Sequence, residues 1–336
     1  MMEFDASITD ADTRISAQVV VVIINWNSGI MLFNCLKHLE LQTVQPKQIM
    51  VIDNASSDES ADCVNAFKNV TLHRMESNLG FAAANNHALS VCDAEFVVLL
   101  NPDAFPAPTW LEYLLGAANA FPDIAAFGSR QLCNNMPAIL DGTGDNYHVS
   151  GLVWRDRNGK KQELPDLVSK AIFSPCAAAA LYRRQVLLDI GGFDEDYFCY
   201  VEDVDLGFRL RLAGYSAMYV PDAVVRHEGS ATTGGRRSDF AVYHGRRNLI
   251  WTYIKNMPGI LFWVFLPVHV LLNIVTIAYF TKCGQGKVIL TAMSDALCGV
   301  PCMWRKRRSI QLNRNVSYLS ILGAMDKRLF PRNRRS

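Results

Sequence analysis

Short apolar runs, rich in β-branched residues, recur through the first hundred residues of the chain. Three of them cover residues 18–24, 48–52 and 96–100. Unbroken runs of this length are typical of strands that are buried on both faces of a sheet. Apolar residues at helical spacing separate the runs, and this alternation predicts an α/β fold with a mostly parallel sheet flanked by helices. Residues 125–170 predict loops and short strands over one edge of that sheet.

Polar side chains gather where the predicted strands end. They are Asn25, Asp53, Asn54, Asp58, Asn78, Gly80, Asn101 and Asp103. Parallel strands present their carboxyl ends at one edge of a sheet, where open α/β folds bind ligands. Pro102 cannot donate a ladder hydrogen bond, so it ends the strand at 96–100 and leaves Asp103 just beyond it. One such residue would indicate an ordinary turn, but this many Asn and Asp residues predict a site for a polar ligand.

A second polar cluster has six carboxylates in the twelve residues from Asp194 to Asp205. Carboxylates this close repel one another unless a cation or an arginine partners them. The alternatives are an acidic, solvated start of a helix and a packed, partly dry site with shifted pKa values. The second is favoured by four aromatic neighbours, Phe193, Tyr197, Phe198 and Tyr200. A strand is predicted at 216–220 after this cluster, and His227 follows it.

The last third of the chain is apolar and then basic. Residues 260–280 carry no Lys, Arg, Asp or Glu and are just long enough to span a bilayer. From Pro301 onward there are ten Lys or Arg residues and one acid, Asp326. A spanning helix, an interfacial helix and a buried helical hairpin all remain open. We favour binding to an anionic membrane surface over a helical cap with a solvated basic end. The net charge of the whole chain is only +1, so we expect no nucleic-acid partner.

The chain is therefore expected to divide into three parts: a disordered lead-in at 1–17, a catalytic domain at 18–248 and a membrane-associating helical region with a basic tail at 249–336. The nine cysteines form no CxxC pair, which favours reduced thiols. The first residues are acidic and lack the apolar core of a secretory signal. We expect a protein on the cytoplasmic face of the cell membrane, peripheral or monotopic, with a single span possible.

The order of the motifs resembles that of the family 2 glycosyltransferases, which have the GT-A fold, a Rossmann-like mixed and mostly parallel sheet. The segments that carry the resemblance are 22–27, 51–58, 78–82, 85–86, 101–103, 191–195 and 202–206, with Arg209. Asn101 stands where the first aspartate of the family's DxD motif lies. This variant resembles the branch that contains bacterial rhamnosyltransferases of cell-surface polysaccharide synthesis.

The resemblance implies inverting transfer of a sugar from a nucleoside diphosphate sugar to a saccharide acceptor. The favoured donor is dTDP-rhamnose, and the favoured acceptor is linked to a polyprenyl diphosphate. The alternatives are another donor, such as a UDP-hexose or UDP-galactofuranose, and a non-catalytic protein that binds sugar nucleotides at a membrane. A nucleotidyltransferase is less favoured, because no basic Gly-rich loop follows the first strand.

Transfer requires a hard cation at the leaving diphosphate and a base at the acceptor hydroxyl. The resemblance assigns Mg²⁺ or Mn²⁺ to Asp103 and His227. It assigns the base to Asp203, with Glu202 as the less favoured candidate. The residues expected to bind the nucleotide sugar are Asn25, Asp53, Asn54, Asp58, Asn78, Gly80, Asn101 and Arg209.

Overall fold

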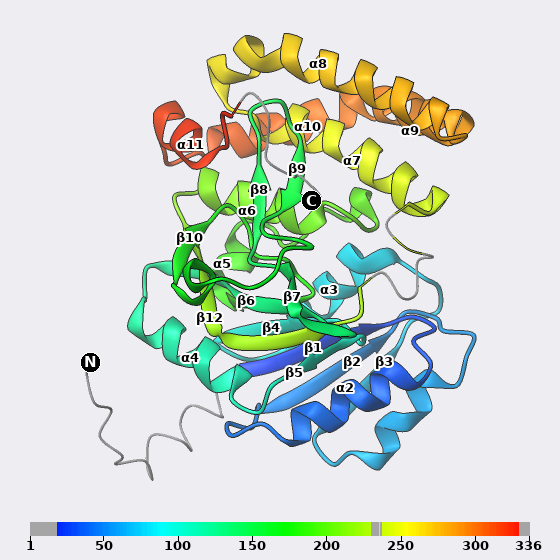
Figure 1. Cartoon of the computed structure of the whole chain (residues 1–336), viewed down its shortest axis with the longest axis vertical. Coiled ribbons are helices and arrows are strands. Elements are labelled where there is room, and N and C mark those ends of the chain that lie inside the picture. The colour runs from blue at the N-terminus through cyan, green and yellow to red at the C-terminus, as the bar shows by residue number, and fades with distance from the viewer. Residues whose placement is uncertain (1–18, 230–234, 236, 329–336) are drawn as a thin grey trace.

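A ten-stranded mixed sheet forms the centre of the fold (Figure 1). The computed structural model describes residues 19–229, 235 and 237–328, so the lead-in expected at 1–17 lies outside the described residues. The strand order is β10-β12-β6-β11-β4-β1-β2-β3, with β5 paired to β12 and β7 paired to β6. A separate two-stranded sheet joins β8 and β9. The α/β class and the GT-A arrangement expected from the sequence both fit this topology.

The N-terminal half of the sheet is parallel. Its strands are β1 (Val19–Asn25), β2 (Gln48–Asp53), β3 (Val70–Arg74) and β4 (Phe96–Leu100). Strand β1 lies between β2 and β4, with Val19 opposite Phe96 and Asn25 opposite Asp53. Every residue of β1 and β4 is buried, as the unbroken apolar runs predict. The polar residues that follow these strands therefore meet at one edge of the sheet.

The C-terminal half of the sheet is mixed and departs from the sequence prediction. Its strands are β5 (Ala104–Pro106), β6 (Ile124–Cys133), β7 (Met136–Gly142), β10 (Lys170–Ile172), β11 (Ala179–Arg183) and β12 (Ser216–His227), and the small sheet has β8 (Asp145–Tyr147) and β9 (Val153–Arg155). Strand β6 is a long inner strand in a segment where only loops and short strands were expected. Strand β12 continues past Val220 through a register shift between Val220 and Val224, and it ends at His227. The prediction that this strand ends near Val220 was wrong, because the irregularity accommodates Pro221 within the strand.

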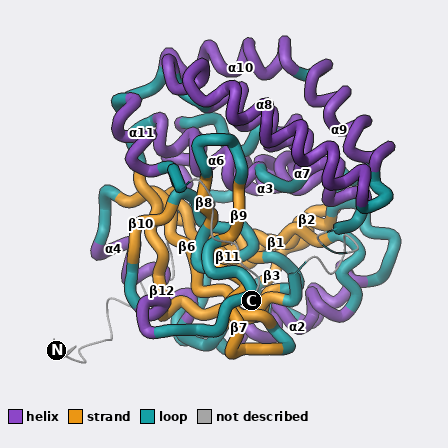
Figure 2. Tube along the Cα trace, turned by 45° about the horizontal axis from the view of Figure 1, so that its top comes forward, coloured by secondary structure: helices purple, strands orange, loops and turns teal. Residues whose placement is uncertain are grey.

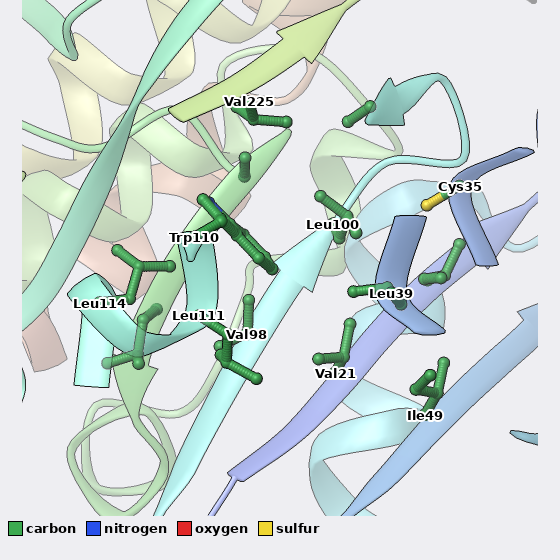
Figure 3. Packing of buried hydrophobic residues seen from close by; sticks show 14 of the residues in the cluster. Val21, Cys35, Leu39, Ile49, Val98, Leu100, Trp110, Leu111, Leu114 and Val225 are labelled. Atoms are coloured by element: carbon green, nitrogen blue, oxygen red, sulfur yellow. The ribbon is translucent and has the colours of Figure 1, made fainter. Parts of the chain in front are cut away.

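Helices cover both faces of the sheet. They are α2 (Ile30–Glu40), η1 (Ser60–Ala66), α3 (Gly80–Val91), α4 (Trp110–Ala120), η2 (Leu164–Leu167), α5 (Arg184–Asp189), η3 (Glu195–Tyr197) and α6 (Glu202–Leu212). On one face, Val21 and Val98 pack against Leu39 of α2 and Leu111 of α4 (Figure 3). On the other face, the alternate strand residues pack against α3, α5 and α6. This period-two alternation gives the sheet a hydrophobic core on each side.

A layer of C-terminal helices packs on α6 (Figure 2). Its members are α7 (Asp239–Asn256), α8 (Gly259–Lys282), α9 (Gly286–Cys298), α10 (Val300–Leu312) and α11 (Tyr318–Ala324). Helix α6 turns Leu206 and Leu210 toward the sheet. It turns Val204 and Phe208 toward the C-terminal layer. Helix α7 runs through residue 248, where the boundary between the catalytic domain and the C-terminal region was expected.

Within the described residues, α8 is the one unbroken helix that is long and apolar enough to cross a membrane, and α9 with α10 passes the same test only as a pair bent by 53°. One face of α8 packs on the protein. His269 stacks on Tyr253 with ring centroids 3.9 Å apart, and its Nδ1 lies 2.7 Å from the Ser150 carbonyl oxygen. The opposite face is apolar and exposed, with Trp263 at 62% and Leu271 at 59% exposure. The helix therefore has one face bound to protein and one face free for an apolar environment.

Candidate functional site

A cavity of about 490 Å³ opens at the carboxyl ends of the parallel strands. Eight of the twelve predicted site residues line it: Asn54, Asn78, Gly80, Asn101, Asp103, Glu202, Asp203 and His227. The other four, Asn25, Asp53, Asp58 and Arg209, lie outside its lining. The cavity thus brings together both expected metal ligands and both candidate bases.

Three of the outlying residues hold the loops after β1 and β2. Asn25 donates its side-chain amide to Asp53 Oδ1 at 2.9 Å and to the Ser60 hydroxyl at 2.9 Å. Asp58 accepts from the Gly29 backbone N–H at 3.0 Å. These bonds hold the two loops against each other, and other residues of the loops line the cavity.

Asn54, Asn78 and Gly80 form one wall of the cavity. Asn54 donates to Asn78 Oδ1 at 2.8 Å and accepts from the Leu79 backbone N–H at 3.0 Å. Gly80 begins α3 with φ +82°, and a Cβ atom there would lie 2.6 Å from the Phe198 carbonyl oxygen. Only glycine satisfies both the positive φ and this close approach.

Asp103 and His227 meet on one side of the cavity, where the metal is expected from the sequence. Strand β5 pairs with β12 so that Ala104 lies opposite His227. This pairing places His227 Nε2 3.3 Å from Asp103 Oδ1. On the other side of the ring, Nδ1 lies 2.8 Å from Asp141 Oδ2, so each ring nitrogen faces a carboxylate. Burial lowers the pKa of His227, but hydrogen bonds and charges of Asp103 and Asp141 outweigh it and raise the pKa to about 9.

A carboxylate oxygen and an imidazole nitrogen at this distance can share a divalent cation, which would replace the proton that the two groups share in its absence. Oxygen and imidazole ligands both suit Mn²⁺, and a second carboxylate behind the histidine is the usual device that orients its ring. Asp141 occupies that second position. Asp103 and His227 thus lie close enough to share a metal, and a second group, made of Asp145, Cys176 and Asp203 with ligand atoms within 4.8 Å of one another, could also hold one.

Asp203 and Glu202 begin α6 on the opposite side of the cavity. Asp203 accepts from the backbone N–H groups of Val204 at 2.8 Å and Ala177 at 3.1 Å. Glu202 Oε2 is buried and has no hydrogen-bond partner. Burial and the charge of Asp203 raise the pKa of Glu202 well above its ordinary value. Burial also raises the pKa of Asp203, but the Ala177 N–H and the Arg155 charge act against it, so we assign the negative charge of the pair to Asp203.

Arg155 joins the two sides of the cavity from behind. Its Nη1 donates to Asp141 Oδ2 at 2.6 Å, and its Nε lies 3.8 Å from Asp145 Oδ1. The guanidinium also donates to Cys176 Sγ. Since Asp141 contacts His227 and Arg155 contributes positive charge at Asp203, this arginine links the metal side to the base side.

The loop before α6 is held in an unusual conformation. Phe198, Tyr200 and Val201 have φ values of +62°, +66° and +71°. A β-branched residue in this region is an outlier, and such strain persists only where the surroundings over-determine it. Asn248 of α7 supplies that restraint, because its amide donates to the carbonyls of Tyr197, Cys199 and Tyr200 at 2.8–3.0 Å.

Cations pair with three carboxylates of the acidic cluster, Asp194, Asp196 and Asp205. Asp205 Oδ2 accepts from Arg209 at 2.8 Å, and its Oδ1 lies 2.8 Å from Lys255 Nζ. Lys255 and Lys306 both bind Asp194. Arg209 completes its bonds with the carbonyl oxygens of Ile190 at 3.0 Å and Gly192 at 2.7 Å. The cluster is thus an ion network between α6 and the C-terminal helices, and Arg209 belongs to it.

Several residues at the site were missed by the sequence analysis. Asp141, Trp154 and Arg155 come from the segment predicted to contain loops and short strands. Their one sequence signal is the presence of charged and aromatic residues in a Gly-rich segment. Nothing in the sequence marks Asn248 as a residue of the site, because the role of a single Asn in a helix depends on its tertiary neighbours.

Comparison with known proteins identifies the family of the chain. The family described as glycosyl transferase family 2 matches residues 20–191. The chain is 30% identical over 256 residues to the N-acetylglucosaminyl-diphospho-decaprenol L-rhamnosyltransferase of Mycobacterium tuberculosis (strain H37Rv), and the match covers 69% of this chain and 82% of that protein. It is 28% identical over 230 residues to the O-antigen chain rhamnosyltransferase RfbN of Salmonella typhimurium (strain LT2), covering 67% and 70% of the two chains.

Solved structures support the fold. A mannosyltransferase from Pyrobaculum calidifontis in complex with GDP-Man and Mn²⁺ superposes with a TM-score of 0.52 at 17% identity, covering 91% of this chain and 86% of that one. The structure of GalNAc-T7 with UDP, GalNAc and Mn²⁺ gives a TM-score of 0.58 at 14% identity, covering 71% and 48%. These likenesses confirm the expected GT-A fold. The chain is a glycosyltransferase that belongs to glycosyl transferase family 2 and resembles its bacterial rhamnosyltransferases.

Proposed function

We propose that this glycosyltransferase moves L-rhamnose from dTDP-rhamnose, with inversion, to a saccharide carried on a polyprenyl diphosphate at the cytoplasmic face of a membrane. One observation carries the proposal: Asp103, His227 and Asp203 face a single cavity at the carboxyl ends of the parallel strands. The rhamnosyltransferase relatives support the sugar, and the decaprenol-linked substrate named for one of them supports the acceptor. The exposed apolar face of α8 supports placement at a membrane.

The metal has its own role in this proposal. Asp103 and His227 hold Mg²⁺ or Mn²⁺, which neutralises the charge of the leaving diphosphate. Asp141 and Arg155 keep the His227 ring in place. The resident Mn²⁺ in two solved structures with the same fold supports the choice of a divalent cation.

Asp203 acts as the general base toward the acceptor hydroxyl. Two backbone N–H groups and the charge of Arg155 favour its ionised form, whereas Glu202 is kept neutral by burial. Asn54, Asn78, Gly80 and Asn101 bind the donor from the other wall of the cavity. Asn25, Asp53 and Asp58 contribute by holding the loops that present these residues.

The test is the release of nucleoside diphosphate from a panel of dTDP-, UDP- and GDP-sugars, including dTDP-rhamnose and UDP-galactofuranose. The assay contains a polyprenyl-diphosphate saccharide and either Mg²⁺, Mn²⁺ or a chelator. We expect metal-dependent release from dTDP-rhamnose and a loss of about 10²–10⁴-fold in Asp203→Asn, which retains the shape of the side chain but cannot accept the proton.

Each other result contradicts a named part of the proposal. Release from a different donor would replace the sugar, and unchanged release in Asp203→Asn would remove Asp203 as the base. Donor binding without release from any sugar nucleotide would favour a non-catalytic binding protein. Release of pyrophosphate would indicate a nucleotidyltransferase.

A further inference from the structure

A second cavity, of about 330 Å³, lies among the C-terminal helices. It is lined by Trp304, Arg307, Arg308, Gln311, Arg314 and Tyr318, with Gly259 at its edge. None of these residues lines the catalytic cavity. In Figure 1 the helices that form it, α8, α10 and α11, lie together at the top of the molecule, beyond α7 and α6 from the sheet.

The cavity gathers positive charge that no carboxylate neutralises. Three of its lining residues are arginines and none is acidic, and no ion pair joins these arginines to an acid within the described residues. Arg307 Nη1 donates to the carbonyl oxygens of Ile254 and Met257. Arg314 donates Nη1 to the Val316 carbonyl, while its buried Nε has no partner. Three guanidinium groups around one cavity therefore favour an anion that accepts hydrogen bonds.

Aromatic side chains hold this charge in place. Arg307 lies 4.7 Å from the Phe262 ring centroid, and Arg314 lies 4.3 Å from that of Tyr318. Tyr318 packs so closely on Gly259 that a Cβ atom there would lie 2.4 Å from its ring. The guanidinium groups are therefore held in position before an anion binds. A planar guanidinium suits the oxygens of a phosphate.

Exposed apolar residues flank the lining residues along the chain, and the four named next are called the rim. Ile260 and Trp263 of α8 are each 62% exposed, Leu312 of α10 is 84% exposed, and Leu319 of α11 is 77% exposed. The apolar face of α8 continues from this rim toward residue 279. Free phosphate cannot bury these apolar side chains. A lipid can, because its acyl chains are attached to the headgroup that carries the phosphate.

We infer that this cavity binds the headgroup phosphate of an anionic phospholipid, and that it forms one docking surface with the exposed face of α8. The inference rests on the membrane placement proposed above, but not on the glycosyl transfer. Arg308 and Arg314 contact the phosphate, and Arg307 supports them while it holds the end of α7. The rim side chains insert among the acyl chains.

The experiment measures binding of the full chain to vesicles without donor or acceptor. The vesicles are phosphatidylcholine alone or phosphatidylcholine mixed with phosphatidylglycerol. The test variant is Arg308→Gln with Arg314→Gln. Its charge-matched control is Arg305→Gln with Lys327→Gln, which removes two exposed cations that do not line the cavity. Circular dichroism and the Tm verify that each variant is folded.

We expect the test variant to lose about tenfold or more of its preference for anionic vesicles, and the control to lose much less. Equal losses in the two variants would indicate diffuse attraction and overturn the cavity as the site. Loss of the preference when inorganic phosphate is added at the concentration of the lipid would also overturn it, because the ligand would then be free phosphate. Nucleoside diphosphate release in detergent should stay unchanged in the test variant, so failure of the lipid site and failure of the catalytic proposal give different results.

Discussion

At the scale of single residues, the buried ion network around Asp205 has a clear dependence on pH. Burial raises the pKa of Asp205, but Lys255 and Arg209 outweigh it and hold the pKa well below its ordinary value. A carboxyl whose pKa is lower in the folded state stabilises the fold above the unfolded pKa, and this contribution is lost as the pH falls through the folded value. The network therefore stabilises the protein at neutral pH and fails in acid.

Replacing Asp205 with Asn should lower the free energy of unfolding at pH 7 by about 3–5 kcal/mol, because Lys255 and Arg209 remain buried without their partner. The difference from wild type should shrink below about pH 4, where the carboxyl of the unfolded chain is itself protonated. Urea titrations at both pH values measure this, with Asp93→Asn as an exposed control. An equal difference at both pH values would show that the charge of Asp205 is not responsible.

Arg155 is a positioning residue rather than a catalytic one, so its replacement should change metal binding. Arg155→Lys keeps the charge but loses the planar group that reaches Asp141 and Cys176 together. We expect the Mn²⁺ concentration for half-maximal activity to rise about 10–100-fold. Arg157→Lys is the control, because Arg157 pairs with Asp166 outside the cavity. Unchanged metal dependence in Arg155→Lys would remove the arginine from this role.

Motif order was sufficient to predict eight residues that line the cavity, but not the residues that hold them in place. Asp103 could be placed at the cavity because a strand end and a family motif coincide there, and His227 because the family resemblance points to it. Asp141, Arg155 and Asn248 could not, because their importance arises from contacts across long stretches of chain. Their hydrogen bonds to His227, Cys176 and the loop before α6 exist only after the sheet has formed.

At the scale of secondary structure, the start of α3 depends on a residue without a side chain. Gly80→Ala should lower the free energy of unfolding by more than about 1 kcal/mol, because of the positive φ and the clash with Phe198. It should also weaken donor binding, because Phe198 and Asn78 line the cavity on either side. Calorimetric titration with the donor and a urea melt measure the two effects.

Gly116→Ala in α4 is the matched control for this substitution. Gly116 lies inside a helix, and a Cβ atom there would meet nothing within 4 Å. The change should therefore raise the free energy of unfolding by about 0.5–1 kcal/mol. If Gly80→Ala also raised the free energy of unfolding, the close approach to Phe198 would not affect stability.

The strands were predictable where their residues are uniformly apolar, as in β1 and β4. Strand β6 was missed because Ser129 and Gln131 interrupt its apolar pattern. Both are buried, and Ser129 accepts from the Trp110 indole at 2.8 Å. Polar residues in an inner strand look like loop residues until their buried partners are known.

At the scale of the whole molecule, α6 packs on both the sheet and the C-terminal helices, so we expect the two parts to unfold together. Phe208 is fully buried between α6 and the C-terminal layer. Phe208→Ala should cost about 3–5 kcal/mol and lower the Tm of a single calorimetric transition. Phe121→Ala, at a position that is 46% exposed, is the control and should change stability far less. Two separate transitions, only one of them shifted, would show that the C-terminal helices fold independently.

The ion network between α6 and α10 has a consequence for the choice of acceptor. Lys306 of α10 binds Asp194, which lies near the loop before α6. Arg308 lines the proposed lipid cavity only two residues further along the same helix. Within the described residues, this ion pair connects the reactive centre directly to the helix that lines the proposed lipid cavity, so we expect the centre to be held at a fixed height above the bilayer. If the proposed lipid site is correct, we expect the enzyme to select acceptors by the number of sugars between the lipid anchor and the hydroxyl that reacts.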